Sequence, residues 1–151
     1  VAIDISDDAL KVADYNKKYN NADYIKLIKS DMFSSSECEQ YKNEDNRFDV
    51  IVSNPPYIPT KDIDELSEEV RLHDPVLALD GDTDGLKFYK AITKQSVNYL
   101  KENGYLCYEI GYNQAEDVRN IMEQCGYSGI KVIKDLAGLD RVVIGRLNNI
   151  N

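Results

Sequence analysis

The first half of this chain lacks glycine. All eight glycines lie at Gly81 or later, so no glycine-rich loop of the kind that lets a backbone approach a nucleotide closely is found before that residue. The usual sequence fingerprint of a nucleotide-binding turn is therefore absent.

Metal ligands and nucleophile triads have little representation either. His73 is the only histidine, and Cys38, Cys107 and Cys125 are far apart without a metal-ligand spacing. A metal site or a Ser-His-Asp triad therefore has almost no support. Three separated cysteines predict reduced thiols, as in a cytoplasmic protein.

Long apolar runs and clusters of positive charge are also lacking. No stretch is long and apolar enough to span a membrane, and no signal peptide is recognisable. The formal net charge is −9, with a pI near 4.6, which argues against a chain that grips a phosphate backbone unaided. We therefore expect a protein or small-molecule partner, with no direct contact to nucleic acid or membrane.

Length and composition fit one globular domain over residues 1–151. Of the 151 residues, 42% are hydrophobic and 30% are charged, which is ordinary for a soluble protein that buries a core. Because the chain starts with Val1 and reads at once as a strand, we expect it to be an excised piece of a larger fold.

Strands and helices are predicted to alternate. Hydrophobic patterning predicts six strands, at residues 1–5, 24–28, 48–53, 105–110, 130–133 and 141–147. The last two are joined by a connection too short for a crossover helix, so they should pair antiparallel.

Helix signals lie between these strands. Helices are predicted over residues 7–20, 85–101 and 114–125. Their boundary residues are the N-cap Ser6, the stop signal Asn103-Gly104, the capping pair Asn113 and Glu116, and the closing Gly126.

Two segments are predicted to be irregular. Residues 34–46 form a polar loop with one short helical turn, and residues 58–84 are acidic, with a short helix around 64–70. A segment as long as the second is more often functional than structural. We expect it to be a lid or a substrate-side insertion.

The most informative motif is Asn54-Pro55-Pro56-Tyr57, directly after the strand at residues 48–53. In open α/β sheets, ligands bind at the carboxyl ends of strands. Proline locks φ and restricts the residue before it, so this turn holds the Asn54 side-chain oxygen and the adjacent backbone carbonyls in fixed directions. Such an array accepts the hydrogens of an –NH2 group. The alternative interpretation is a plain strand followed by a proline turn.

This motif resembles the (D/N)PPY signature of S-adenosylmethionine-dependent methyltransferases that act on amide or exocyclic amino nitrogens. Further similar blocks are Glu69-Val70-Arg71, residues 74–81, residues 84–89, Glu109-Ile110-Gly111 and residues 140–146. Together they resemble the HemK-type glutamine methyltransferases, which modify the glutamine of the Gly-Gly-Gln loop of peptide-chain release factors.

The resemblance implies a Rossmann-like class I methyltransferase fold, an α/β sheet that ends in an antiparallel hairpin. It also implies S-adenosylmethionine as cofactor, a release factor as protein substrate, and a role in translation termination. The family's N-terminal helical domain, first strand and glycine-rich loop are not expected within this chain. We therefore expect weak cofactor binding or none, and either pairing of strands 1–5 and 48–53 or self-association through their unpaired edges.

The resemblance places the cofactor against four residues. Asp4 accepts hydrogen bonds from both ribose hydroxyls, Asp31 and Met32 hold the adenine, and Asn54 also contacts the cofactor. The residues themselves leave alternatives open: Asp4 helps to cap the helix after Ser6, Asp31 is only a turn residue, and Met32 belongs to the core.

The substrate amide is placed on the turn Asn54-Pro55-Pro56-Tyr57. The Asn54 side-chain oxygen and the Pro55 carbonyl each accept one hydrogen of the –NH2 group, and the Tyr57 ring packs on the amide. Local packing is the alternative for Tyr57. Glu109 is a candidate base, with a structural hydrogen bond as the alternative.

Two charged groups of residues have structural alternatives. Arg71, His73 and Asp74 lie where a substrate would pass, and the alternative is a surface salt-bridge cluster. Asp140 and Arg141 are either a charged turn or support for the Asn54 turn.

Three functions compete. The preferred one is a protein-glutamine methyltransferase that acts on a release factor, or on a ribosomal protein as a near rival. The second is an amino-group methyltransferase for nucleic acid, which would need a basic groove and a base-flipping pocket. The third is a non-catalytic binding fragment.

Overall fold

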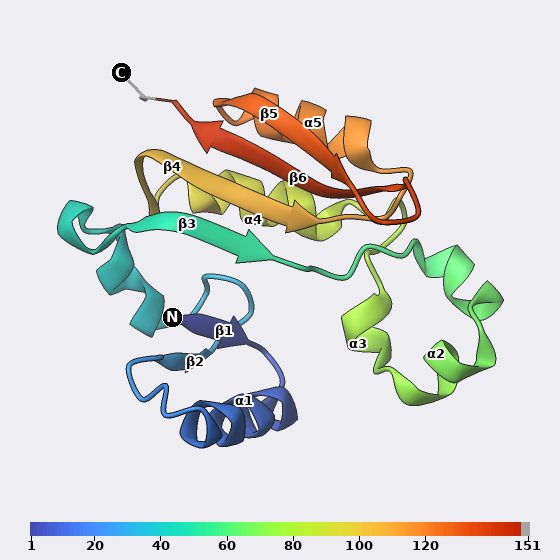
Figure 1. The fold of residues 1–151 in the computed structure, drawn as a ribbon, viewed down its shortest axis with the longest axis horizontal. Coiled ribbons are helices and arrows are strands. Elements are labelled where there is room, and N and C mark those ends of the chain that lie inside the picture. The colour runs from blue at the N-terminus through green and yellow to red at the C-terminus, as the bar shows by residue number, and fades with distance from the viewer. Residues whose placement is uncertain (149–151) are drawn as a thin grey trace. The chain divides into compact units, whose positions relative to one another are not determined.

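The computed structural model describes residues 1–148. It divides into two compact units, Val1–Asn46 and Arg47–Asn151. Figure 1 shows the elements of both units. No helix within the described residues is both long and apolar enough to cross a membrane.

The first unit is a small parallel sheet with one connecting helix. Strand β1 (Ala2–Asp4) pairs parallel with β2 (Leu27–Lys29), and α1 (Asp7–Tyr19) joins them. The prediction for Ser6 is confirmed, because its hydroxyl oxygen accepts a hydrogen bond from the Ala9 N–H at the start of α1.

Two predictions in this unit need correction. The strand predicted at residues 24–28 begins only at Leu27, because Ile25 N donates to Ala22 O in a turn and Tyr24 is 87% exposed. The polar segment after β2 is more helical than predicted. It contains two 3-10 helices, η1 (Ser36–Lys42) and η2 (Glu44–Asn46).

The second unit is built on a mixed sheet. Its strands are β3 (Phe48–Ser53), β4 (Leu100–Glu109), β5 (Tyr127–Lys134) and β6 (Asp140–Leu147), in the spatial order β3-β4-β6-β5. β3 and β4 are parallel, whereas β6 is antiparallel to β4 and β5. The predicted closing hairpin is confirmed, as is the count of six strands in the described part of the chain.

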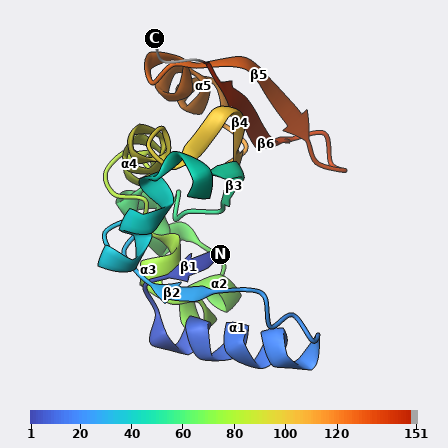
Figure 2. The ribbon, with the colours of Figure 1, turned by 90° about the vertical axis from the view of Figure 1, so that its left-hand side faces the viewer.

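Helices α4 (Lys87–Ser96) and α5 (Ala115–Gln124) cover one face of this sheet, as Figure 2 shows. Tyr108 of β4 is fully buried there, with its ring edge-on to Tyr89 of α4 at 5.1 Å between centroids. Its hydroxyl shares a hydrogen bond of 2.8 Å with Thr93. Aromatic packing and buried hydroxyl pairs therefore fix α4 on the sheet.

The prediction that Asn103-Gly104 ends a helix is wrong. Helix α4 ends at Ser96, and β4 has begun by Leu100. The register against β3 jumps from Phe48↔Leu100 to Val50↔Tyr105, and Asn103 has φ of 64°. Asparagine and glycine favour left-handed backbone at a strand irregularity as well as at a helix end, and here they make an irregularity.

The predicted capping pair Asn113 and Glu116 is also wrong. The N-cap residue of α5 is Gln114, and its side chain makes no capping bond. The end of the helix is as predicted, because Gly126 follows the C-cap with φ of 89°.

β1 pairs with β2 in the first unit, and β3 pairs with β4 in the second. Within the sheet of its own unit, each of the two strands has one strand neighbour, and pairing between β1 and β3 stays a prediction.

The segment after β3 holds three short helices where one was predicted: η3 (Thr60–Glu65), α2 (Glu68–His73) and α3 (Val76–Leu79). Its two ends meet. Ile58 N donates to Leu79 O at 3.0 Å, and Gly81 N donates to Ile58 O at 2.8 Å. The segment is thus a loop closed at its base, immediately beyond Tyr57.

Candidate functional site

The turn Asn54–Tyr57 leaves the carboxyl end of β3, where Ser53 is still paired with Tyr108 of β4. Pro55 is buried, whereas Asn54 is exposed. Within residues 1–148 the Asn54 side chain has no hydrogen-bond partner. The turn therefore carries an available amide on a backbone that is fixed from behind.

The fixed side of the turn is held by Gln114, which is only 7% exposed. Its Nε2 donates to the Tyr57 carbonyl at 3.0 Å and to the Gly85 carbonyl at 3.3 Å, while its Oε1 accepts from Gly111 N at 3.1 Å. The amide group thus faces two acceptors with its donor end and one donor with its acceptor end. This side chain joins three separate segments behind the turn.

Two glycines let the chain pass close behind Tyr57. A Cβ on Gly85, whose φ is 71°, would lie 2.3 Å from the Tyr57 carbonyl oxygen, and a Cβ on Gly81 would lie 2.9 Å from the Tyr57 backbone. Only glycine fits such an approach. The glycines of the two motif blocks at residues 74–81 and 84–89 therefore have a local structural role.

The Tyr57 ring packs locally. A Cβ on Gly111 would meet Tyr57 Cδ2 at 3.4 Å, so the ring lies against this backbone. The residue is half-buried, and this supports the local packing alternative. Contact of the ring with a substrate stays a prediction.

Glu109 lies at the end of β4, where its backbone contacts α4, and both predicted roles of its side chain stay predictions. Its backbone carbonyl accepts a hydrogen bond from the Tyr89 hydroxyl at 3.0 Å. Burial raises the pKa of Tyr89 above its ordinary value, so this hydroxyl also stays a donor in moderately alkaline solution. A role of the Glu109 side chain as a base remains untested.

The other predicted cofactor residues lie in the first unit. Asp4 ends β1, and its carbonyl accepts from Ser30 N at 3.0 Å, so Asp31 follows at the same edge of the small sheet. Asp4 Oδ1 accepts from Ser6 N at 2.8 Å, which is the capping alternative, and Asp31 O accepts from Ser34 N in a turn. Met32 is half-buried with φ of 49°.

The structure thus brings Asp4 and Asp31-Met32 together and places Asn54 in the second unit. Their contacts with ribose and adenine stay predictions.

Two further groups of charged residues have clear positions. Arg71, His73 and Asp74 are exposed, and none forms a salt bridge within the described part, so the cluster alternative is wrong. Arg141 pairs with Asp135 at 3.3 Å and donates to Ile110 O at 3.2 Å. It supports the carboxyl end of β4, beside Gly111.

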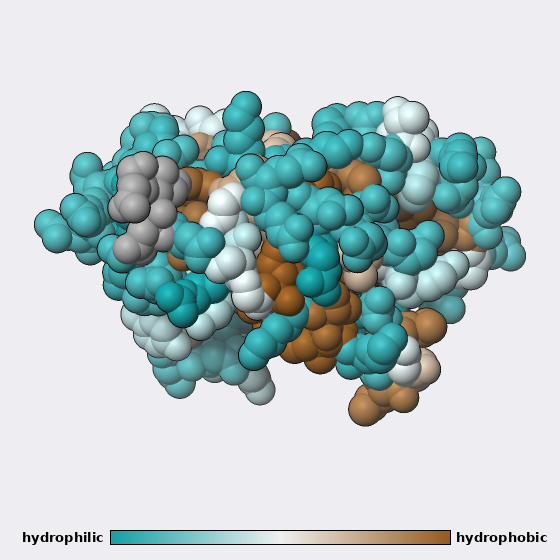
Figure 3. All heavy atoms as spheres, turned by 90° about the horizontal axis from the view of Figure 1, so that it is seen from above, coloured by the Kyte–Doolittle hydropathy of each residue, from teal (hydrophilic) through white to brown (hydrophobic). Residues whose placement is uncertain are grey.

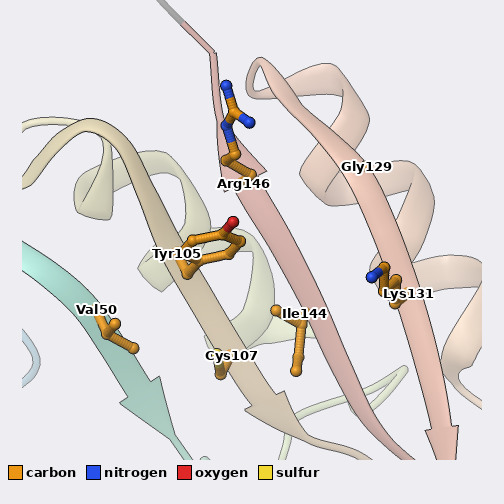
Figure 4. Close-up of a pocket in the computed structure, with 7 residues that line it drawn as sticks. All are labelled: Val50, Tyr105, Cys107, Gly129, Lys131, Ile144 and Arg146. Carbon is orange, nitrogen blue, oxygen red and sulfur yellow. The ribbon is translucent and has the colours of Figure 1, made fainter.

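A shallow depression of about 540 Å³ lies on the sheet face opposite the helices. Figure 4 shows its lining residues: Val50, Tyr105, Cys107, Gly129, Lys131, Ile144 and Arg146. Burial raises the pKa of the Cys107 thiol, which disfavours a reactive thiolate. Figure 3 shows hydrophilic side chains over most of the upper surface, with apolar areas between them. We therefore take the Asn54 turn, and not this depression, as the candidate site.

Sequence reasoning missed Gln114. Its position beside a helix start favours a capping or solvent-exposed role, and only the tertiary contacts show that it is buried. No sequence signal marked it, because the motif block recognised nearby ends at Gly111, three residues before Gln114.

A family model described as Eco57I restriction-modification methylase matches residues 3–121. The release factor glutamine methyltransferase of Fusobacterium nucleatum is 41% identical over 144 residues, which are 95% of this chain and 39% of that protein. That of Clostridium acetobutylicum is 40% identical over 142 residues, 93% of this chain and 48% of that protein. The chain therefore spans less than half the length of these two relatives.

Two solved structures show the fold. A methyltransferase from Pyrococcus furiosus matches with a TM-score of 0.66 at 17% identity, over 98% of this chain and 62% of that one. A ribosomal protein L11 methylase from Lactobacillus delbrueckii matches with a TM-score of 0.61 at 19% identity, over 98% and 57%. The predicted class I methyltransferase fold, an α/β sheet with an antiparallel end, is confirmed. The match over residues 3–121 shows that the chain belongs to the methyltransferase family described as Eco57I restriction-modification methylase.

Proposed function

We propose that the protein transfers a methyl group from S-adenosylmethionine to the side-chain amide nitrogen of a protein glutamine, in the Gly-Gly-Gln loop of a peptide-chain release factor. The observation that carries this proposal is the Asn54 turn, with an exposed, available amide on a double-proline backbone at the end of β3. The names of relatives about 40% identical to the chain support the same substrate.

The proposed task of the turn is alignment. An amide nitrogen is a poor nucleophile, because its lone pair is delocalised into the carbonyl. The Asn54 side-chain oxygen and the Pro55 carbonyl accept its two hydrogens and hold the nitrogen in line with the methyl donor. Their dipoles also stabilise the positive charge that develops on nitrogen. The N-methylated amide first carries the positive charge on its nitrogen, and this cation is acidic enough to lose a proton to water or to a carbonyl relay, so no strong base is needed.

The chemistry of the first unit fits the proposed cofactor, which supplies an electrophilic methyl group on a sulfonium. Asp4 is exposed, and only one of its carboxylate oxygens takes the local hydrogen bond from Ser6 N. A carboxylate at a strand's carboxyl end suits ribose hydroxyls. Asp31 and Met32, at the same edge, would hold the adenine.

An amino-group methyltransferase for nucleic acid is the second candidate, and the description of the matching family model favours it. The net charge of −9 speaks against it, because a duplex is held mainly by Lys and Arg. A ribosomal protein glutamine remains a rival substrate, and a non-catalytic binding role is the third candidate.

The proposed partner is the release factor, in the cytoplasm, without direct contact to nucleic acid or membrane. Self-association through the edges of β1 and β3 that have no strand neighbour in their own sheet is a further proposal, since unpaired edges recruit other strands. Light scattering tests it, and a concentration-independent monomer would contradict it.

The decisive assay uses the full-length protein and S-adenosylmethionine with a labelled methyl group. Release factor should become labelled, a Gln→Ala change in its Gly-Gly-Gln loop should abolish labelling, and duplex DNA should stay unlabelled. Labelled adenine with unlabelled release factor would overturn the proposal. Ribosomal proteins in place of the release factor distinguish the two glutamine substrates.

Variants at Asn54 connect the assay to the turn. Asn54→Ala removes an acceptor aimed at the nitrogen and should lower turnover by a factor on the order of 100 to 1000. Stability should stay the same, because the side chain is exposed and has no hydrogen-bond partner in the described residues. Asn54→Asp keeps the acceptor geometry but adds a charge beside the sulfonium, so it separates geometry from charge.

A further inference from the structure

We propose that Gln114 is a positioning residue for the Asn54 turn: it holds the Tyr57 carbonyl from behind and thereby sets the direction in which Asn54 and Pro55 present their oxygens. The structural part of the proposal follows from the hydrogen bonds of Gln114. The expected effect on turnover rests on the proposed function.

Gln114 stands at the start of a helix, but its side chain does not bond that helix. As the N-cap residue of α5 it could cap its own helix, yet its side chain makes no capping bond. Instead the amide turns back to Tyr57, Gly85 and Gly111. The side chain thus bonds segments that lie far away in the sequence, in place of the first turn of its own helix.

A contact at the Tyr57 carbonyl can fix the position of Asn54 because few backbone torsions between the two are free. Pro55 and Pro56 have fixed φ angles, and each proline restricts the residue before it. Between the Asn54 side chain and the Tyr57 carbonyl oxygen, the freely variable backbone torsions are therefore ψ of Pro56 and φ and ψ of Tyr57. The other end is held by the pairing of Ser53 with Tyr108. The Ser53 pairing fixes where the turn begins, and the bond from Gln114 to the Tyr57 carbonyl fixes where it ends. Loss of the second contact should therefore change the direction in which Asn54 and Pro55 present their oxygens.

Only an amide of this length supplies both donors and an acceptor. A carboxylate at this position would accept from Gly111 N but would face the carbonyls of Tyr57 and Gly85 without a donor. An apolar side chain of similar length would leave all three backbone groups unpaired. Gln114→Glu and Gln114→Met therefore break the anchor in different ways with little change in size.

The matched control is Val118→Ala, one turn further along α5. Val118 is fully buried, so the variant loses stability in the same helix, and it changes neither the Gln114 side chain nor any of its three backbone partners.

The experiment measures urea unfolding, turnover and KM for both substrates in the full-length protein. Gln114→Glu and Gln114→Met should lower turnover by a factor on the order of 100, as small misplacements of reacting groups do, with a much smaller change in the KM for the cofactor, since three of its four predicted contact residues lie in the first unit. Val118→Ala should keep the turnover of the parent. Equal turnover in all three variants, at similar losses of stability, would overturn the proposal.

A pH profile separates positioning from packing. The carboxyl introduced by Gln114→Glu becomes a donor when it is protonated, and burial raises the pKa of such a group. Turnover relative to the parent should therefore recover as pH falls for Gln114→Glu but not for Gln114→Met. Parallel profiles for the two variants would contradict the anchor.

A readout without activity keeps the anchor testable if the proposed methylation fails. In NMR spectra, the side-chain amide of Asn54 should shift and broaden in Gln114→Glu and Gln114→Met and stay unchanged in Val118→Ala. An unchanged Asn54 signal in the Gln114 variants would overturn the inference, whatever the reaction is.

Discussion

The two faces of the four-stranded sheet differ sharply although the same strands make both. On β4, Leu106 and Tyr108 are fully buried under the helices, whereas Tyr105, one residue earlier, is 43% exposed. Side chains alternate along a strand, so each strand contributes to a packed face and to an open one. Stability is concentrated on the packed face.

The packed face also carries the anchor of the candidate site. Directly after β4, the chain continues into Ile110 and Gly111, which are buried, and Gly111 is held by Gln114 behind the Asn54 turn. On the open face, the depression has no such link to the turn. The side of the sheet that holds the fold together therefore also fixes the turn in place.

The largest effect should come from Tyr108→Ala, on the packed face. It removes a fully buried ring and its partner contacts with Tyr89 and Thr93, and should lower the free energy of unfolding by about 3–5 kcal/mol. Its matched control is Tyr105→Ala on the open face, with an expected loss of about 1 kcal/mol or less. Urea unfolding followed by circular dichroism measures both, and equal losses would abolish the distinction between the faces.

A smaller loss is expected for Gly145→Ala on β6. A Cβ there would lie 2.6 Å from Met122 Cε of α5, and overpacking of this kind costs about 1–3 kcal/mol. Because Cε ends a flexible side chain, the loss should shrink by at least about 0.5 kcal/mol in a Met122→Leu background. A double-mutant cycle measures this coupling. If the effects of the two changes were strictly additive, the contact with Met122 Cε would not be the source of the strain.

Alkaline pH should lower the stability of the protein, because a tyrosine with a raised pKa lies on the packed face. Burial raises the pKa of Tyr127 to about 12, and its hydroxyl shares a hydrogen bond with Ser96. The folded pKa is above the unfolded one, so the stabilisation is fully present below the unfolded pKa of about 10 and is lost as pH rises through the folded value. The urea midpoint should therefore fall between about pH 10 and pH 12. Tyr127→Phe should flatten this fall, and an identical slope would exclude Tyr127 as its source.

Local signals predicted much of this fold. Ser6, Gly126 and the short connection before β6 each act within a few residues, so their capping and turn chemistry is visible in sequence. The pair Asn103-Gly104 failed because positive φ serves a strand irregularity as well as a helix end. The alternatives differ in tertiary pairing, which the pair itself does not encode.

In the candidate site, too, residues with local signals could be predicted from the sequence, and residues that depend on tertiary contacts could not. The Asn54 turn was visible because its prolines act on their own backbone. Gln114 was not, because its partners Tyr57 and Gly85 lie 57 and 29 residues away. The exposure of single side chains could not be predicted either. The apolar run Val50-Ile51-Val52 is typical of a buried strand, yet Val52 is 75% exposed.

The smallest effect should come from Val52→Thr on the open face of β3. Threonine keeps the β-branched shape that suits a strand, and an exposed hydroxyl stays hydrated, so stability should change by no more than about 0.5 kcal/mol. The same change at the fully buried Val143 on the packed face should cost about 1–3 kcal/mol, because its hydroxyl would lack a partner. Urea unfolding of both variants in the full-length protein gives the comparison. A loss at Val52 as large as that at Val143 would mean that the open face is covered in solution and that the two faces are equivalent.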